Sequence, residues 1–235
     1  MIQSTQSRDT VRQAGSAPVL WLIRHGESTW NVRGLAQGHD DQARLTEHGR
    51  RQAWRIVGQL SAQPIQALYS SDLHRALETV APLASVLRLA VTRDARLRER
   101  CLGVAEGTAT AAISPAVSGI SAQRVVDPDA RPAGGESLRD FYQRVACFAA
   151  DLAARHPGAG AGPGAGPGAG PGAGVGAGAG AGRAGDVAII AHGGTLRMLD
   201  AYLRGIPVEQ MAWAPLANGR ILRSPAACPV RLTHP

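Results

Sequence analysis

The sequence predicts an α/β fold, a three-layer α/β/α sandwich with a mostly parallel central sheet. Two observations lead to this prediction. Short apolar runs rich in Val, Ile and Leu, typical of strands that are buried on both faces, recur along the chain. Between them lie longer stretches whose apolar residues repeat at spacings of three and four, as in amphipathic helices. With 235 residues and a hydrophobic fraction of 44%, the chain is long enough to bury a substantial core in one domain.

The strands expected in this sheet are identified by their apolar runs. The clearest lie at 19–23, 65–69 and 186–191, and the last of these contains the run Val-Ala-Ile-Ile-Ala. Weaker signals predict two further strands at 220–223 and 230–233.

Helices are expected at four places, indicated by apolar periodicity and by residues that favour helix starts. They are 46–61, 71–87, 136–156 and 194–204. Ser137 and Asp140 have the spacing of a capping box at the start of the third helix, and Ser71 is expected to cap the second. Pro82 is expected to kink that second helix.

Two segments are expected to have no fixed structure. Residues 1–18, rich in Gln, Ser, Thr and Arg, are expected to be a disordered tail before a domain at 19–235. Residues 157–185 are almost wholly Gly, Ala and Pro, and are expected to form a flexible loop that interrupts this domain. The end of the loop matches GxGxxG at 180–185. Because a dinucleotide site needs a strand before this motif and a helix after it, we give the match no functional meaning.

The ends of the expected strands carry residues suited to phosphate chemistry. Arg24 and His25 follow the first strand, and His192 follows the third. Arg75 lies within a turn of helix after the second strand. In α/β sheets ligands bind outside the carboxyl ends of the strands, so these side chains are expected to lie close together. Histidine can act as a nucleophile and arginine binds phosphate oxygens through a bidentate fork. The combination suggests covalent phosphoryl chemistry.

Seven motifs in a fixed order carry a resemblance to a known family. The motifs are RHGESTWN at 24–31, QG at 37–38, LTEHGRRQA at 45–53, SSDLHRALET at 70–79, LRERCLGVAEG at 97–107, GGES at 134–137 and AHGGTLR at 191–197. Any one alone would be weak because short motifs recur by chance, but seven in order form a specific pattern. With them the chain resembles the histidine phosphatase superfamily, also called the phosphoglycerate mutase-like family. The resemblance implies the same sandwich architecture, with the active site at one edge of the sheet.

The resemblance also assigns roles to single residues. His25 matches the nucleophile that becomes a phosphohistidine, and Glu99 matches the group that protonates the leaving oxygen and then helps to activate water. The phosphate-binding positions are matched by Arg24, Arg75, His192 and Asn31, and further substrate-binding positions by Gln37, Gly38 and Gly193. No metal and no cofactor are expected, because the arginines supply the positive charge.

These assignments have alternatives within the sequence. An isolated Arg-His pair at a strand end is most often an ordinary loop, an isolated Arg75 a solvated helix residue, and an isolated His192 a histidine near the core. Glu106 and Asp94 are carboxylates close to Glu99 in sequence. The spacing Glu-x-x-x-Gly-x-x-Glu-Gly favours Glu99 as the acid and Glu106 as a structural partner. The remaining histidines show no metal-ligand spacing and are expected at the surface: His39, His48, His74, His156 and His234.

The expected function is hydrolysis of small phosphorylated metabolites through a phosphohistidine. The alternative is a cofactor-dependent phosphoglycerate mutase. Family members with that activity carry a lysine and an arginine pair between the acid and the second histidine, whereas 108–132 of this chain holds only Arg124 and Arg131, which are not adjacent. The Gly-x-x-Glu-Gly motif at 103–107 resembles the phosphatase branch, although Ala105 stands where an aromatic residue is usual. A non-catalytic phosphate-binding or adaptor protein is a remote alternative, because no catalytic position is missing.

Charge and cysteine content bear on partners and compartment. The net charge is +7 and all 25 basic residues are arginine, which excludes a P-loop lysine or a Schiff-base lysine. The arginines are scattered and no aromatic-rich stretch accompanies them, so a small phosphorylated substrate is expected rather than specific nucleic acid. No apolar stretch is long enough for a membrane span, and no signal peptide is evident. Three widely separated cysteines favour the reducing cytoplasm. The sequence does not indicate an oligomeric state.

Overall fold

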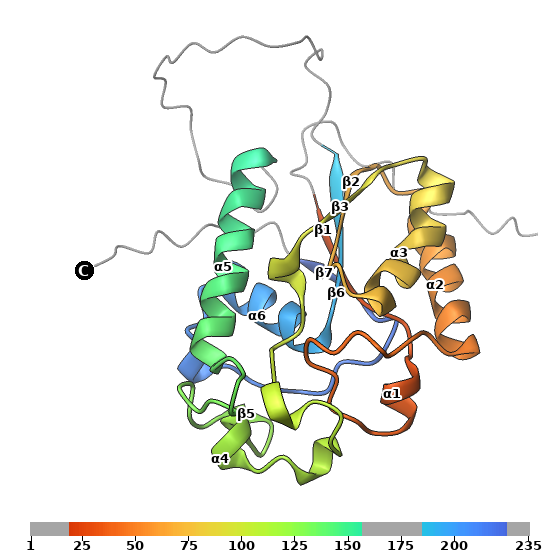
Figure 1. The fold of residues 1–235 in the computed structure, drawn as a ribbon. Coiled ribbons are helices and arrows are strands. Elements are labelled where there is room, and N and C mark those ends of the chain that lie inside the picture. The colour runs from red at the N-terminus through yellow and green to blue at the C-terminus, as the bar shows by residue number, and fades with distance from the viewer. Residues whose placement is uncertain (1–18, 157–184, 225–235) are drawn as a thin grey trace, which may run out of the picture.

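The computed structural model describes residues 19–156 and 185–224, and the statements below concern these ranges (Figure 1). The tail expected at 1–18, the Gly/Ala/Pro segment up to residue 184 and the strand expected at 230–233 lie outside the described residues.

Five strands form the central sheet in the order β3-β2-β6-β1-β7. They are β1 Leu20–Arg24, β2 Ile65–Ser70, β3 Val91–Arg93, β6 Asp186–Ala191 and β7 Ile221–Ser224. The first four strands run parallel, and β7 pairs antiparallel with β1 at one edge. Every residue of β6 is buried, because this strand lies mid-sheet with both faces covered. The predicted mostly parallel sheet is confirmed. β3 was not predicted because it is only three residues long and lies at the edge, with no buried residue.

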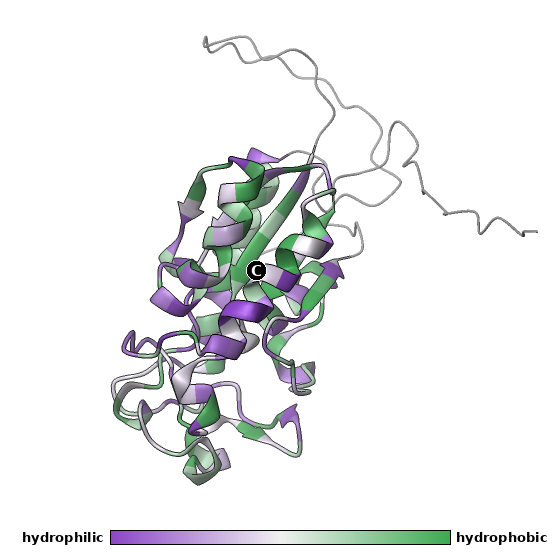
Figure 2. Ribbon diagram, turned by 90° about the vertical axis from the view of Figure 1, so that its right-hand side faces the viewer, coloured by the Kyte–Doolittle hydropathy of each residue, from purple (hydrophilic) through white to green (hydrophobic). Residues whose placement is uncertain are grey.

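Helices cover both faces of the sheet and complete the predicted three layers (Figure 1). On one face lie α2 (Glu47–Leu60) and α3 (His74–Leu87), and on the other α5 (Leu138–Arg155) and α6 (Gly193–Leu203). Alternate side chains of β6 enter two separate cores, Ile189 on the α5–α6 side and Ile190 on the α2–α3 side. Figure 2 shows hydrophobic strands in the middle of the molecule and helices that carry both hydrophobic and hydrophilic stretches.

Two of the four long helices, α2 and α5, begin at side-chain caps. Ser137 and Asp140 form the predicted capping box of α5, each side chain accepting a hydrogen bond from the backbone N–H of the other at 3.0 Å. Thr46 caps α2 by accepting the N–H of Gly49 at 3.0 Å. Such caps satisfy backbone donors that a helix start leaves unpaired.

The start of α3 differs from the prediction. This helix begins at His74, and the residue before it makes no side-chain cap. The prediction that Ser71 caps the helix was wrong, because its hydroxyl instead lies 2.9 Å from the Nε2 atom of His192. Pro82 lies inside α3, which continues to Leu87.

Short elements follow the carboxyl ends of the parallel strands, and α1, α4 and β5 among them lie in the lower part of Figure 1. They are α1 (Thr29–Val32), α4 (Pro115–Ser118), the hairpin of β4 (Ile120–Ser121) and β5 (Arg124–Val125), and the 3₁₀ turns η1 (Ala95–Leu97), η2 (Gly103–Ala105), η3 (Thr110–Ala112) and η4 (Val208–Gln210). None is long enough to give a clear periodicity, so none was predicted.

No helix in the described ranges is long and apolar enough to cross a bilayer. Cys101 and Cys147 are free thiols, and Cys228 lies outside the described residues.

Candidate active site

The carboxyl ends of β1, β2 and β6 bring together segments that are far apart in sequence. The backbone N–H of His25 donates to the carbonyl of Ala191 at 3.0 Å, and on the other side of β6 the N–H of Ser71 donates to the carbonyl of Ile190 at 3.0 Å. The ring centroids of His25 and His192 are consequently 5.1 Å apart. Strand pairing thus places the residues that follow three strands next to one another.

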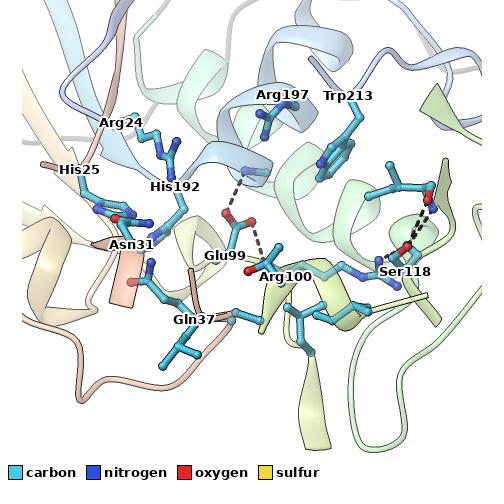
Figure 3. A pocket seen from close by; sticks show the side chains of 18 of the residues that line it. Arg24, His25, Asn31, Gln37, Glu99, Arg100, Ser118, His192, Arg197 and Trp213 are labelled. Atoms are coloured by element: carbon cyan, nitrogen blue, oxygen red, sulfur yellow. Dashed lines mark hydrogen bonds between the residues drawn. The ribbon is translucent and has the colours of Figure 1, made fainter. Parts of the chain in front are cut away.

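A pocket of about 420 Å³ opens at this edge of the sheet (Figure 3). Every residue to which the sequence assigned a role lines it except Gly193, and these are Arg24, His25, Asn31, Gln37, Gly38, Arg75, Glu99 and His192. Gly194, rather than Gly193, belongs to the wall. The lining residues that were not predicted are Leu35, Ala36, Arg100, Leu102, Thr110, Ile113, Ser118, Ile120, Arg197 and Trp213.

The buried His25 imidazole has a defined protonation state. Its Nδ1 atom lies 2.7 Å from the carbonyl oxygen of Gly26. Because a carbonyl can only accept, Nδ1 carries the proton and Nε2 keeps its lone pair. Burial, followed by the positive charges of Arg75 and Arg24, holds the pKa of His25 well below its ordinary value. His25 is therefore neutral near pH 7, with Nε2 able to act as a nucleophile.

His192 has the opposite tautomer. Its Nδ1 accepts a hydrogen bond from Nε of Arg75 at 3.2 Å, so Nε2 carries the proton and donates to the hydroxyl of Ser71 at 2.9 Å. Burial and then the neighbouring Arg75 hold the pKa of His192 well below its ordinary value. The ring is thus neutral, and a phosphate oxygen can replace the hydroxyl as acceptor of its one N–H.

Two arginines, the buried Arg75 and the half-buried Arg24, supply positive charge. Arg75 donates to the backbone carbonyls of Asp40 at 2.9 Å and Gly38 at 2.8 Å. Burial lowers the pKa of Arg75 to about 10, so it remains cationic at neutral pH. Arg24 donates through Nη1 to the carbonyl of Leu216, whereas its buried Nε has no partner among the described residues. An unpaired buried donor costs roughly 1–3 kcal/mol, which a ligand acceptor would remove.

Two side-chain amides complete the polar wall. Asn31 Oδ1 accepts the backbone N–H of Ser28 at 3.0 Å and the side-chain N–H of Asn218 at 3.0 Å, which leaves the Asn31 amino group for a ligand. Gln37 Oε1 accepts a hydrogen bond from the hydroxyl of Ser28 at 3.0 Å, which leaves the Gln37 amino group for a ligand as well. Asn218 also donates to the carbonyl of His25 at 3.1 Å. It was not predicted, because nothing in the surrounding loop sequence marks it.

Gly38 and Glu106 form one structural unit. Gly38 has a φ of +48°, and a Cβ atom there would lie 2.1 Å from Glu106 Oε1. That oxygen accepts the backbone N–H groups of His39 at 2.8 Å and Leu102 at 2.9 Å. Glu106 does not line the pocket. These contacts agree with the interpretation of Glu106 as a structural partner rather than the acid.

The other histidines are only partly at the surface. His48 and His74 are exposed as predicted, and His234 lies outside the described residues. The prediction was wrong for His39, which is half-buried with an Nε2 atom that has no partner in the described ranges. It was also wrong for His156, which is half-buried with its Nε2 2.9 Å from the Tyr69 hydroxyl.

The Glu99 carboxylate is oriented by two backbone donors. Oε1 accepts the N–H of Arg100 at 2.9 Å, and Oε2 accepts the N–H of Gly194 at 2.9 Å. A Cβ atom on Gly194 would lie 2.1 Å from Glu99 Oε1, so this approach requires glycine. Each carboxylate oxygen keeps a further lone pair, through which it can exchange a proton with a group in the pocket.

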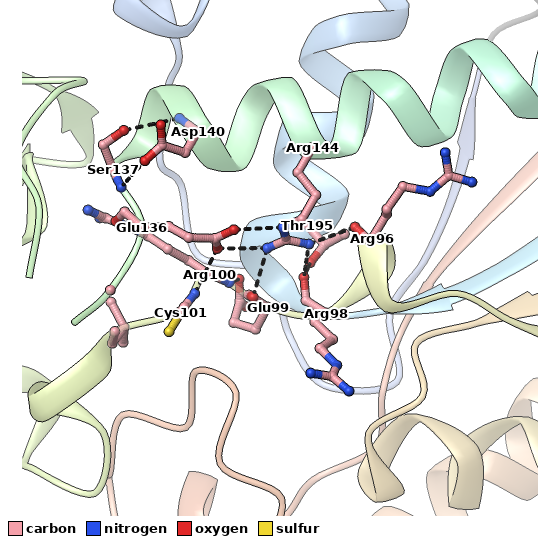
Figure 4. A network of polar contacts seen from close by, with 12 residues as sticks. Arg96, Arg98, Glu99, Arg100, Cys101, Glu136, Ser137, Asp140, Arg144 and Thr195 are labelled. Atoms are coloured by element: carbon pink, nitrogen blue, oxygen red, sulfur yellow. Dashed lines mark hydrogen bonds and ion pairs between the residues drawn. The ribbon is translucent and has the colours of Figure 1, made fainter.

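Arg144 of α5 holds the backbone that carries Glu99 (Figure 4). It donates to the carbonyls of Arg96 at 2.7 Å, Arg98 at 3.1 Å and Glu99 at 3.1 Å. It also forms an ion pair with Glu136 at 2.7 Å. Burial alone would raise the pKa of Glu136, but the hydrogen bonds and charge of Arg144 lower it instead. Three carbonyls and one carboxylate thus fix this segment to the helix.

No group of three or more His, Cys, Asp or Glu side chains in residues 19–156 and 185–224 is arranged to hold a metal ion. The cationic side chains that line the pocket are all arginines: Arg24, Arg75, Arg100 and Arg197.

Comparisons with known proteins agree with this geometry. A family model described as the histidine phosphatase superfamily, branch 1, matches residues 20–161. The phosphoglycerate mutase-like protein 4 of Arabidopsis thaliana is 38% identical over 142 residues, which cover 58% of this chain and 61% of that protein. The match therefore spans less than two thirds of that relative's length.

Longer matches connect the chain to mycobacterial proteins. The glucosyl-3-phosphoglycerate phosphatase of Mycobacterium tuberculosis is 33% identical over 189 residues, 80% of this chain and 76% of that protein. A solved structure titled mycobacterial hydrolase 1 superimposes with a TM-score of 0.70 at 30% identity, covering 88% of this chain and 90% of the other. The chain therefore belongs to the histidine phosphatase superfamily.

Proposed function

We propose that this protein hydrolyses phosphomonoesters of small metabolites through a phosphohistidine at His25, without a metal ion. One observation carries the proposal. A buried, neutral imidazole has its Nδ1 proton held by the Gly26 carbonyl, and it lines a pocket that also contains the buried Arg75 and the half-buried Arg24. A neutral nucleophile beside fixed cations suits attack on a dianionic phosphate.

In the first step the phosphate oxygens are bound by Arg24, Arg75 and the N–H of His192, with the amides of Asn31 and Gln37 as further donors. The Nε2 lone pair of His25 attacks phosphorus, and the bond from phosphorus to the ester oxygen breaks. Glu99, in its protonated form, gives its proton to the departing oxygen, and the alcohol leaves. The guanidinium groups stabilise the charge on the equatorial oxygens of the loose transition state.

In the second step the Glu99 carboxylate takes a proton from a water molecule, whose oxygen attacks the phosphorus of phosphohistidine. The bond to Nε2 breaks and returns the lone pair to His25, while Nδ1–H stays bound to the Gly26 carbonyl. Inorganic phosphate leaves and Glu99 is protonated again. Division into two steps replaces direct attack of water on a phosphomonoester, which is among the slowest reactions known.

The phosphoglycerate mutase alternative is less well supported. Arg124 and Arg131 are the only basic residues at 108–132, and neither lines the pocket. Arg131 is instead paired with Asp140 at 2.5 Å. A relative matched over 80% of this chain and 76% of its own length carries the name of a phosphatase, whereas the mutase-like relative from Arabidopsis thaliana is matched over 58% and 61%.

A phosphate-release screen over phosphorylated metabolites, with mutase activity assayed in parallel, tests the proposal. We expect the wild type to release phosphate in the presence of EDTA, and His48→Ala, which changes an exposed histidine, to behave alike. Isomerisation of phosphoglycerates without phosphate release would establish the mutase instead. Activity that EDTA abolishes and a divalent ion restores would contradict the metal-free mechanism.

A further inference from the structure

The pocket is larger than a phosphoryl group requires. Its volume of about 420 Å³ falls in the range of sites that enclose a whole small ligand, roughly 300–1,000 Å³. Beyond the polar end, the wall is largely apolar and includes Leu35, Leu102, Ile113 and Ile120. The organic part of a substrate is therefore expected to lie against this second end.

Arg197 is a charged group in this wall with no ion pair. Its side chain is half-buried, its Nε donates to the carbonyl of Ala214 at 2.7 Å, and its guanidinium lies 5.1 Å from the ring centroid of Trp213 (Figure 3). No carboxylate of the described ranges is within ion-pair distance of it. Arg204, at the end of the same helix, contrasts with it by pairing with Asp200 at 2.8 Å. Burial lowers the pKa of Arg197 and the charge of Glu99 partly offsets this, but Glu99 acts from beyond ion-pair distance. The guanidinium therefore keeps donors that an anionic group of a ligand in the pocket can accept.

Arg197 and Arg24 lie close to each other. A Cβ atom on Gly193 would lie 3.1 Å from Nη1 of Arg197 and 3.5 Å from Nε of Arg24. Burial, and more weakly the charge of Arg197, lower the pKa of Arg24, while Glu99 partly offsets the effect. The two cations are therefore placed to hold two anionic groups of one ligand at neighbouring positions.

The aromatic platform beneath Arg197 is held by the β4–β5 hairpin. The N–H of Trp213 donates to the carbonyl of Gln123 at 2.6 Å. Gln123 and its neighbour Ala122 form the two-residue turn of the hairpin, with φ values of +59° and +45°. Non-glycine residues adopt such values only where the surrounding structure imposes them. The backbone at Trp213 is thus held in place by the hairpin, with the ring beside Arg197.

We propose that Arg197, stacked on Trp213, binds a second anionic group of the substrate, such as a carboxylate, next to the phosphoryl group that Arg24 and Arg75 hold. The site then selects phosphomonoesters whose alcohol part is both apolar and anionic. Arg24, Arg75 and the amide groups already donate hydrogen bonds to the phosphoryl oxygens. Arg197 is therefore available for the organic part of the substrate. This inference rests on the proposed function, because it concerns the same pocket.

Matched aryl phosphates test the proposal. The probes are the 3- and 4-carboxyphenyl phosphates, which place a carboxylate at two distances from phosphorus, and the corresponding neutral carboxamides. Wild type is compared with Arg197→Gln and with Arg204→Gln, which removes an arginine from the same helix outside the pocket. Arg197→Lys keeps the charge and serves as a second variant should Arg197→Gln not fold.

We expect Arg197→Gln to lower kcat/KM for at least one carboxylate by about tenfold or more, mainly through KM, because a charge-assisted hydrogen bond is worth at least that factor. The carboxamides should change by less than about threefold. Arg204→Gln should leave kcat/KM unchanged for both the carboxylates and the carboxamides. Arg197→Lys should retain part of the preference for carboxylates. Equal losses on carboxylates and carboxamides, in either Arg197 variant, would instead assign Arg197 to the phosphoryl group or to Glu99.

A failure of the proposed function gives a different result. If the wild type hydrolyses no probe, the phosphatase proposal fails, and calorimetric dissociation constants for the same compounds then decide on Arg197. Tighter binding of a carboxylate than of its carboxamide, lost in Arg197→Gln, would support the subsite. Equal binding of the two would overturn it.

Discussion

The two ends of the pocket are built in different ways. The phosphate end consists of residues at or next to the ends of β1, β2 and β6, held by backbone contacts of the buried sheet. The far end is formed by the segment before α5 and by the loop after η4, which meet through the hydrogen bond between Trp213 and Gln123. The sheet thus fixes the groups suited to chemistry, while loops with little regular structure shape the space for the rest of the substrate.

Two of the arginines that line the pocket, Arg75 and Arg197, differ in their hydrogen bonding. Arg75 has each of its three nitrogens bonded to a carbonyl or to His192, whereas Arg197, which lies between Arg24 and the Trp213 loop, has one bond to a carbonyl and no ion pair in the described ranges. A side chain held at every nitrogen cannot adapt to different ligands. We therefore expect changes at the phosphate end to affect all substrates alike, and changes at the far end to affect some of them.

The largest effect is expected from Arg75→Gln. Loss of a buried cation that faces the phosphoryl group should lower kcat/KM by about 10²–10³-fold on every phosphomonoester. Steady-state kinetics on one alkyl and one aryl phosphate, with circular dichroism to confirm folding, measure this. Arg50→Gln, on the exposed face of α2, is the matched control. Activity within about tenfold of wild type would show that the phosphate end does not depend on this residue.

Glu99→Gln is expected to separate substrates by leaving group rather than by shape. An alkoxide needs a proton as it departs, so kcat/KM for alkyl phosphates should fall by about 10²–10⁴-fold. A nitrophenolate leaves without one, and 4-nitrophenyl phosphate should lose far less. Glu106→Gln, which changes the neighbouring structural carboxylate, should show no such selectivity. An equal loss on both substrates would assign Glu99 to binding, and a selective loss in Glu106→Gln would move the acid there.

Arg144→Met should cause the same selective loss on alkyl phosphates as Glu99→Gln, but a smaller one. Without its bonds to three carbonyls the segment carrying Glu99 can shift, and a small misplacement costs roughly tenfold to 100-fold. The loss should again be larger for alkyl than for aryl phosphates. Removal of this partner also leaves the half-buried Glu136 charge unpaired, so stability should fall, and the double variant Arg144→Met/Glu136→Gln should recover part of it. A loss equal for both leaving groups would reduce Arg144 to a purely structural role.

The smallest effect concerns pH and stability. Burial keeps the pKa of His25 and of His192 well below the ordinary value, so below about pH 6.5 the unfolded chain takes up protons that the folded chain does not. The free energy of unfolding should therefore decrease as pH falls, by up to about 1.4 kcal/mol per pH unit for each histidine. Urea titrations of wild type and His192→Gln between pH 7.5 and 5.5 measure this. Identical pH dependence in both proteins would contradict a neutral, buried His192.

Much of the phosphate end could be predicted from sequence, and little of the far end could. Arg24, His25 and His192 directly follow apolar runs long enough to be identified as strands, so their meeting at one edge follows from parallel pairing. Arg197 lies in a predicted helix, but the sequence alone did not show that its side chain faces the pocket. Trp213 is held by a bond to a two-residue hairpin for which the sequence has no strong turn signal. Ala122 and Gln123 adopt left-handed backbone without being glycine or asparagine.

Adjacent residues could not be distinguished in the same way. Sequence reasoning chose Gly193, whereas Gly194 lines the pocket because only its N–H reaches Glu99. Ser71 has the composition of a helix cap, yet its hydroxyl bonds to His192 across the sheet edge. Both outcomes depend on contacts between segments more than 90 residues apart in sequence. The local conformational preferences of single residues do not predict such contacts.

The central claim is that the phosphoryl group passes through His25. The direct measurement is a rapid acid-free quench of the enzyme with a phosphomonoester, followed by trypsin digestion and mass spectrometry. Because the chain has no lysine, trypsin cuts only at arginine, and the peptide 25–33 contains His25 as its one histidine. We predict an acid-labile phosphate on this peptide, absent from His25→Ala, which should retain less than about 10⁻³ of wild-type activity. Phosphate on the peptide 184–197, which contains His192, or full turnover without any phosphoenzyme, would contradict the account.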